Sequence, residues 1–193
     1  QVLVAPDDEL LSESWVFYVD HEYDINEEWS LTNKAYYEWY ENYGTNAYGF
    51  SQQGESSVYE IQSQIAFAKS YDSLELNAIL SPSYRFTDYE RGNDYINEYF
   101  DRRDLTGPST ALDRRLMATR IDDDYTRYNK GDYGVLGIAL LVDIQTQMGV
   151  DLLLGVRQDE IDQTAEMVGE KTLFEDDFLG KNDDSAFSWT ASI

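Results

Sequence analysis

Residues 133–159 read YGVLGIALLVDIQTQMGVDLLLGVRQD and carry the clearest structural pattern in the chain. Apolar residues occupy every second position of the first half, at Leu136, Ile138, Leu140, Val142 and Ile144. A repeat of two residues predicts a β-strand with one apolar face. After a break at 147–149 the alternation resumes at Leu152, Leu154 and Val156. Two such runs joined by a tight turn predict an antiparallel hairpin.

The same alternation appears in five other segments, so the sequence predicts seven strands: these two and segments 13–25, 29–40, 58–67, 74–87 and 185–193. The apolar face of each segment is built from alternate residues: Trp15 to Ile25, Trp29 to Trp39, Tyr59 to Phe67, Leu74 to Phe86 and Phe187 to Ile193. Proline removes a backbone donor, so Pro82 weakens the prediction locally within its segment.

The connections between the predicted strands alternate in length. Short turns are expected at 26–28, 70–73 and 147–149, and longer polar loops at 41–57, 91–132 and 169–184. Within the second loop, residues 110–121 fit either a short capped helix or an irregular segment. Successive connections of an antiparallel meander lie at opposite ends, so the short turns share one end and the long loops the other. Bacterial outer-membrane barrels have this polarity.

Length and composition limit the classes of function. The 193 residues are enough for one domain with a core. The many aromatic residues (16 Tyr, 8 Phe and 4 Trp) favour β-structure. A net charge of −24 argues against nucleic acid as a partner, because phosphate binding needs clustered Lys and Arg. The chain has no cysteine for a disulfide or a thiolate metal site, and no run of about 18 apolar residues that would span a membrane as a helix.

Side-chain placement extends the similarity to membrane barrels. Several strands carry Glu, Gln, Lys and Arg opposite the apolar face, as a water-filled lumen allows. Aromatic residues lie at predicted strand ends away from the short turns (Trp15, Phe17, Tyr37, Trp39, Tyr59, Tyr84 and Phe86) and beside the turns (Tyr23, Trp29 and Phe67). Two interfacial girdles would explain this distribution, and so would the general preference of strands for aromatic residues.

An odd number of strands has a further implication. Single-chain bacterial barrels have an even number of strands and no free edge. We therefore expect residues 1–193 to form a partial barrel domain, an incomplete antiparallel transmembrane β-barrel of about seven strands that is an internal fragment of a larger barrel.

Five segments resemble barrel strands of TonB-dependent outer-membrane receptors of the ferric-siderophore type. They are WSLTNKAYYEWYENYG (29–44), LSPSYRFTDYERG (80–92), GVLGIALLVDIQT (134–146), VDLLLGVRQDEIDQTA (150–165) and SAFSWTASI (185–193). The resemblance implies a barrel of about 22 strands around a plug, in the outer membrane of a Gram-negative cell. It implies three kinds of partner: a ferric siderophore or other small nutrient, outer-membrane lipid and lipopolysaccharide, and the TonB complex acting through the missing plug.

This sequence departs from the receptor pattern in three ways. It has no recognisable plug, no TonB box and no terminal strand that ends in an aromatic residue. No functional residue is therefore carried over from the family, and the sequence assigns no catalytic, cofactor-binding or metal-binding position.

The residues considered for metal binding are His21 and the acidic run at 122–124. His21, the only histidine, is expected on an apolar face in a structural role, because no second His or Cys completes a zinc site. Asp122-Asp123-Asp124 lacks the glycine and terminal glutamate of an EF-hand loop, which leaves a solvated acidic loop or a weak divalent-cation site.

Two groups of carboxylates share a strand face: Asp20 with Glu22, and Asp143 with Asp159 beside Arg157. They are either salt bridges of a lumen or a glycosidase-like acid pair. The leading hypothesis is thus part of a non-enzymatic outer-membrane receptor whose loops 41–57, 91–132 and 169–184 capture a ligand. The alternatives are a soluble, secreted acidic β-domain that binds carbohydrate or a protein partner, and an enzyme using the second carboxylate group.

Overall fold

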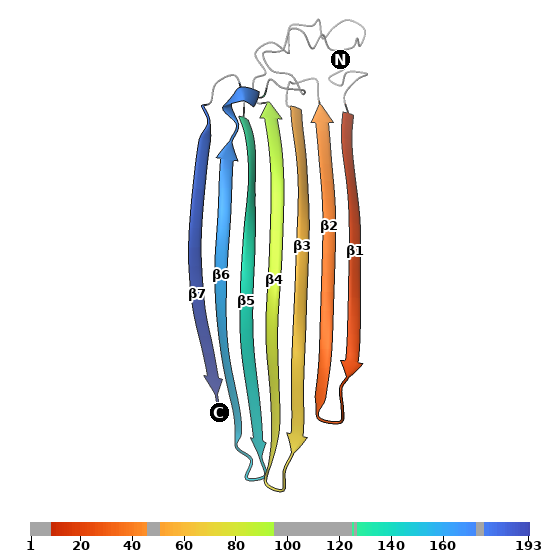
Figure 1. Ribbon diagram of the computed structural model, residues 1–193, viewed down its shortest axis with the longest axis vertical. Helices are drawn as coiled ribbons and strands as arrows, with labels where there is room; N and C mark the ends of the chain where they lie inside the picture. Colours follow the sequence, from red (N-terminus) through yellow and green to blue (C-terminus); the bar gives the residue numbers. More distant parts are fainter. Residues whose placement is uncertain (1–8, 46–50, 95–124, 126, 173–175) are drawn as a thin grey trace, which may run out of the picture.

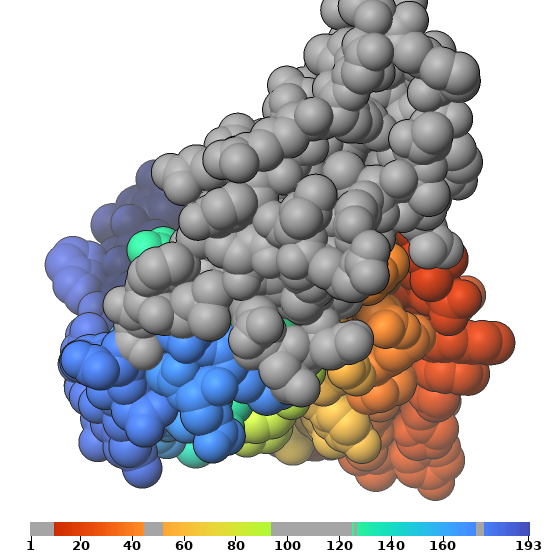
Figure 2. Space-filling view, turned by 90° about the horizontal axis from the view of Figure 1, so that it is seen from above, coloured from red at the N-terminus to blue at the C-terminus, as the bar shows by residue number. Residues whose placement is uncertain are grey.

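Seven β-strands form one antiparallel sheet in the computed structural model (Figure 1). The structure describes residues 9–45, 51–94, 125, 127–172 and 176–193. The strands are β1 (Glu9–Asp24), β2 (Trp29–Thr45), β3 (Ser51–Ser70), β4 (Leu74–Asp94), β5 (Arg127–Thr146), β6 (Asp151–Met167) and β7 (Phe178–Ser192). Each pairs with its neighbours in sequence, and together they follow an arc (Figure 2). The predicted all-β meander is confirmed, and the described sheet is open, with β1 and β7 as its edges.

The pairing register stays constant along each of the six strand pairs. Pro82 was expected to disturb β4, and its effect is confined to the β3 side. There the pairing skips two positions, yet Gln62 still lies opposite Ser83 and Ile65 opposite Leu80. On the other side Pro82 pairs with Ile138 as the register requires. A slip of one residue would turn a strand's side chains to the opposite face, so the constant register keeps each face of the sheet continuous.

The three predicted short turns lie together at one end of the sheet (Figure 1). In the first, the Asn26 side chain accepts hydrogen bonds from the backbone N–H groups of Glu28 and Trp29, at 2.9 and 3.0 Å. This is the Asx-turn chemistry for which asparagine is favoured. In the third, Gly149 adopts a φ of 78°, a conformation that a residue with a Cβ rarely adopts.

An ion pair between the turn and β3 reinforces the first turn. Lys69 at the end of β3 forms an ion pair with Glu28, with 2.7 Å between Nζ and Oε1.

The long loops are shorter than predicted. The strands enter the segments 41–57, 91–132 and 169–184: β2 reaches Thr45 and β3 begins at Ser51, β4 reaches Asp94 and β5 begins at Arg127, and β7 begins at Phe178. Glycine, asparagine and serine suggested loops there, but ladder hydrogen bonds join backbone groups whatever the side chain. The possible helix at 110–121 lies outside the described residues. Within them, no helix is long and apolar enough to cross a membrane.

The strands are 15 to 21 residues long. A tilted transmembrane strand needs only about 9–11 residues. Each strand therefore has several residues more than a bilayer requires, and the additional residues lie toward the end with the longer connections.

Buried apolar packing is confined to that same end. Among the described residues only Tyr125, Tyr128 and Val168 are buried hydrophobics. The rings of Tyr125 and Tyr128 are 5.2 Å apart, and Tyr125 Oη donates to Gln53 Oε1 at 2.7 Å. Tyr125 also forms a backbone bridge with Thr172. This cluster, Tyr125–Tyr128–Val168, fastens the start of β5 to β3 and to the segment after β6.

Gly92 leaves the space that the Tyr125 ring occupies. A Cβ at Gly92 would lie 2.4 Å from Tyr125 Cε1, whereas a Cβ at Gly54 on the adjacent strand would meet only a backbone oxygen at 3.7 Å. Replacing Gly92 by Ala should therefore lower the free energy of unfolding by about 1–3 kcal/mol through overpacking. Replacing Gly54 by Ala should change it by less than about 0.5 kcal/mol.

The measurement is urea-induced unfolding of the full-length protein in detergent micelles, with G54A as the matched control. Equal midpoints for G92A and G54A would contradict the close packing of Tyr125 against Gly92.

Candidate functional site

The constant register brings the alternating apolar residues of all seven strands onto one face, which we call the apolar face. A single row shows the continuity: Tyr23, Leu31, Ile65, Leu80, Leu140, Val156 and Trp189 follow one another across the ladder. These side chains have no covering layer among the described residues, and Trp15, Phe17 and Trp189 are 61%, 59% and 73% exposed. The opposite side is called the polar face.

Aromatic rings form rows on the apolar face. Phe17, Tyr37, Tyr59 and Phe86 are consecutive partners across β1 to β4. The rings of Phe17 and Tyr37 are 6.4 Å apart, and those of Tyr37 and Tyr59 are 5.5 Å apart. Near the short turns, Trp29 and Phe67 have centroids 4.8 Å apart. The predicted upper group thus forms a row, but it lies inside the strands rather than at their ends.

The apolar face ends at a sloping upper edge. We define the apolar band as the apolar-face residues from the short turns up to Trp15, Trp39, Tyr59, Phe86, Leu136, Val156 and Phe187 on β1 to β7.

This edge slopes across the ladder by an amount that can be measured. Trp15 is level with Trp39, whereas Trp189 is level with Leu31, so Phe187 is level with Asn33, six residues below Trp39. The edge descends by about one residue per strand. A rise of about 3.4 Å per residue over a strand spacing of about 4.8 Å gives a tilt of about 35°. Strands of barrels tilt by about 35–45°.

Acidic residues mark the upper boundary of the apolar band on every strand. The first charged residue beyond the band on the apolar face is Glu13, Glu41, Glu55, Asp88, Asp132, Glu160 and Asp183 on β1 to β7. Three of them, Glu13, Glu41 and Glu55, are direct partners in one row. Alternation in the sequence does not reveal this line, because most of these residues lie in segments that the sequence predicts as loops.

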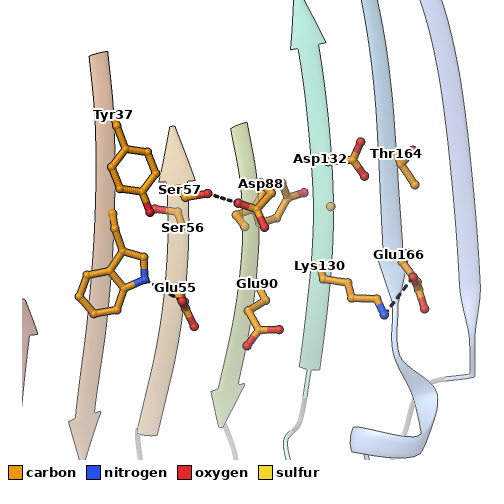
Figure 3. A pocket seen from close by; sticks show the side chains of 13 residues that line it. Tyr37, Glu55, Ser56, Ser57, Asp88, Glu90, Lys130, Asp132, Thr164 and Glu166 are labelled. Carbon is orange, nitrogen blue, oxygen red and sulfur yellow. Dashed lines mark hydrogen bonds and ion pairs between the residues drawn. The ribbon is translucent and has the colours of Figure 1, made fainter. Parts of the chain in front are cut away.

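A hollow of about 500 Å³ lies on the apolar face at this boundary (Figure 3). Tyr37 and Trp39 line it from β2. Carboxylates from β3 to β6 also line it: Glu55, Asp88, Glu90, Asp132 and Glu166. The remaining lining residues are Ser56, Ser57, Tyr89, Lys130, Gly131 and Thr164. We call this feature the boundary hollow.

Hydrogen bonds and an ion pair fix several side chains of the boundary hollow. Trp39 Nε1 donates to Glu55 Oε1 at 2.7 Å, and the Ser57 hydroxyl donates to Asp88. Lys130 Nζ lies 3.3 Å from Glu166 Oε2.

The polar face carries the predicted salt bridge of the hairpin formed by β5 and β6. Arg157 binds Asp159 through two contacts, Nε to Oδ2 at 2.7 Å and Nη2 to Oδ1 at 2.6 Å. Gly137 lies opposite Asp159 and leaves room for the pair, because a Cβ there would approach Asp159 Oδ1 to 2.6 Å. A second pair, Arg85 with Glu60, spans 3.9 Å on the same face.

The structure does not bring Asp143 and Asp159 together. Asp143 accepts a hydrogen bond from Gln145 at 2.9 Å. Asp159 lies opposite Gly137, and six residues of strand separate that position from Asp143, about 20 Å. Acid pairs of glycosidases are about 5–9.5 Å apart. This candidate acid pair is therefore excluded by geometry. Asp20 and Glu22 share the polar face as predicted and are exposed on an edge strand.

His21 occupies the expected position on the apolar face, at the end of a polar row. Ser63 donates to Asn33 Oδ1 at 2.6 Å, and Asn33 Nδ2 lies 3.2 Å from His21 Nδ1. These hydrogen bonds satisfy polar groups that an apolar surrounding would penalise. No cluster of three metal-ligating side chains occurs within the described ranges, and Asp122-Asp123-Asp124 lies outside them.

The fold, the strand tilt and the two unlike faces define a segment of an antiparallel β-barrel. No protein-family model and no curated protein matches the sequence. Solved structures match the fold. The siderophore receptor PiuA from Acinetobacter baumannii has a TM-score of 0.68 at 15% identity, over 96% of this chain and 30% of that one. The ferric citrate transporter FecA has a TM-score of 0.70 at 10% identity, over 94% and 25%.

The ferric-catecholate import receptor Fiu from E. coli K12 matches as well, with a TM-score of 0.66 at 10% identity over 99% of this chain and 32% of that one. The chain therefore spans about a quarter to a third of the length of these receptors. The predicted fold, an incomplete antiparallel β-barrel that is similar to part of the barrels of these receptors, is confirmed.

Two neighbouring leucines on β5 allow the two faces to be compared. Leu140 is on the apolar face and 40% exposed, and Leu141 is on the polar face and 38% exposed. If lipid covers the apolar face, Leu140→Arg should lower the free energy of unfolding in vesicles by about 2–4 kcal/mol. Leu141→Arg, which places the charge in the lumen, should have a much smaller effect.

The measurement is denaturant unfolding of the full-length protein in lipid vesicles, with Leu141→Arg as the matched control. A larger loss for Leu141→Arg would reverse the assignment of the faces.

Proposed function

We propose that the chain forms part of the transmembrane barrel of an outer-membrane receptor that imports a ferric siderophore or a similarly scarce nutrient. The observation that supports this proposal most strongly is a continuous apolar face, which no described residue covers, with a polar face on the opposite side of the sheet. Lipid would cover the apolar face, and water or a plug would contact the polar face. Buried hydrophobics number only three in the described part of the chain, so a dry interior does not hold the strands together there.

The proposed orientation follows from the two ends of the sheet. The short turns face the periplasm, as in other bacterial barrels, and the longer connections face outside, where they help to capture the ligand. Support for the substrate class comes from the matched structures, whose names specify a siderophore, ferric citrate and a ferric catecholate. Energy would come from the TonB complex through a plug outside the matched quarter to third of those receptors. Residues 1–193 would then be one part of the barrel domain.

The alternative of a soluble acidic β-domain has less support. A soluble sheet needs a second layer over its apolar face, because exposed Trp, Phe and Leu in a contiguous patch promote association. The described residues provide no such layer. The slope of the apolar band also has a direct explanation in tilted transmembrane strands, whose lipid-facing residues lie at one depth in the bilayer.

Deletion of the gene for the full-length protein tests the transport role. In an iron-limited culture, the deletion strain should lose uptake of at least one radiolabelled ferric siderophore from a panel of catecholate, hydroxamate and citrate complexes. Uptake should return with the gene on a plasmid, and only in cells with a functional TonB complex.

Uptake of vitamin B12 serves as the control for general damage to the envelope. Unchanged uptake of every iron complex would contradict the substrate class. Recovery of the full-length protein in the soluble fraction would contradict the membrane location as well.

A further inference from the structure

The boundary hollow is a cavity on the apolar face, the side opposite the polar face that would line a lumen. It combines aromatic side chains at the edge of the apolar band with carboxylates and a hydroxyl just beyond it. The described polar contacts inside it involve Trp39, Ser57 and Lys130, each paired with one carboxylate.

The height of the hollow relative to the membrane follows from the strand tilt, and this step depends on the proposed function. Its lining extends from Tyr37 to Glu55, which is level with Glu41, four residues further along β2. Four residues at a tilt of about 35° rise about 11 Å along the membrane normal. The interfacial layer on each side of a bilayer is only about 5–8 Å thick. The upper part of the hollow therefore stands at the level of saccharides rather than of acyl chains or phosphates.

The charge of the hollow limits the chemical classes of ligand that it can bind. Five carboxylates and one ammonium group line it, and that ammonium is already paired with Glu166. Such a site repels phosphate and other anions, which require Arg or Lys. It suits a neutral ligand with many hydroxyl groups, because ionised carboxylates accept strong hydrogen bonds from hydroxyl donors.

The aromatic residues provide the apolar contacts that such a ligand also needs. Tyr37 and Trp39 offer apolar ring surfaces with a polar tip, the combination that suits an amphipathic partner at a wet interface. A sugar ring has apolar C–H faces and polar edges, so rings and carboxylates on adjacent strands match both parts. We propose that the boundary hollow binds neutral sugar residues of the lipopolysaccharide that surrounds the barrel in the outer leaflet.

Matched pairs of residues in the same rows test this inference. Trp39 and Glu55 line the hollow, whereas their row partners Trp15 and Glu13 do not. The variants W39A and E55A should weaken binding of full-core lipopolysaccharide by the purified full-length protein about tenfold. The controls W15A and E13A should leave the dissociation constant unchanged within about twofold. A heat-modifiable band on a gel confirms that each variant is folded.

Lipopolysaccharide of two chemotypes separates sugar from phosphate recognition. A deep-rough form, which keeps lipid A and its phosphates but lacks the neutral core sugars, should bind the unaltered protein about tenfold more weakly than the full-core form. Equal affinity for the two forms would overturn the proposal. So would binding that disappears with EDTA but not with removal of the sugars, because that result indicates a cation bridge to phosphate.

The leucine comparison on β5 keeps the two proposals separable. If Leu140→Arg and Leu141→Arg respond as expected while W39A and W15A bind lipopolysaccharide equally well, only the saccharide site is wrong. If Leu141→Arg is the more harmful change, the assignment of the apolar face to lipid is wrong, and the saccharide site is wrong with it.

Discussion

The whole structure depends on a backbone constraint, the constant antiparallel register of seven strands. Side chains alternate between faces with a period of two, so a slip of one residue in any pair would move apolar side chains to the polar side. The Asx turn at Asn26 and the positive φ of Gly149 fix the strand offsets at two of the short turns. Both faces, the sloping edge and the acidic line are consequences of this register.

The sequence predicts what depends on alternation and fails where side-chain patterns carry no signal. Leu136 to Ile144 and the short turns are visible as a period of two broken by turn residues, and the structure confirms them. The strand ends at 45, 51, 94, 127 and 178 could not be predicted in this way. Beyond the apolar band neither face is hydrophobic, so the alternation disappears even though the ladder continues.

The same limit explains which parts of the candidate site were missed. The pair Arg157–Asp159 was recognised because two residues on one strand face are visible in sequence. The boundary hollow was not, because it joins side chains of five strands, from Tyr37 on β2 to Glu166 on β6, through a register that only the structure supplies. Tyr125 packs against Gly92 across the longest connection, and nothing near either residue in the sequence indicates that contact.

The strand segments above the apolar band have a mechanical consequence in the proposed orientation. On β4, eight residues separate Phe86 from Asp94, and at a tilt of about 35° they rise about 20 Å. A hydrogen-bonded sheet of that height is stiffer than a set of irregular loops and would form part of the wall above the membrane. An incoming molecule would meet ordered strands well above the headgroups on this side of the barrel.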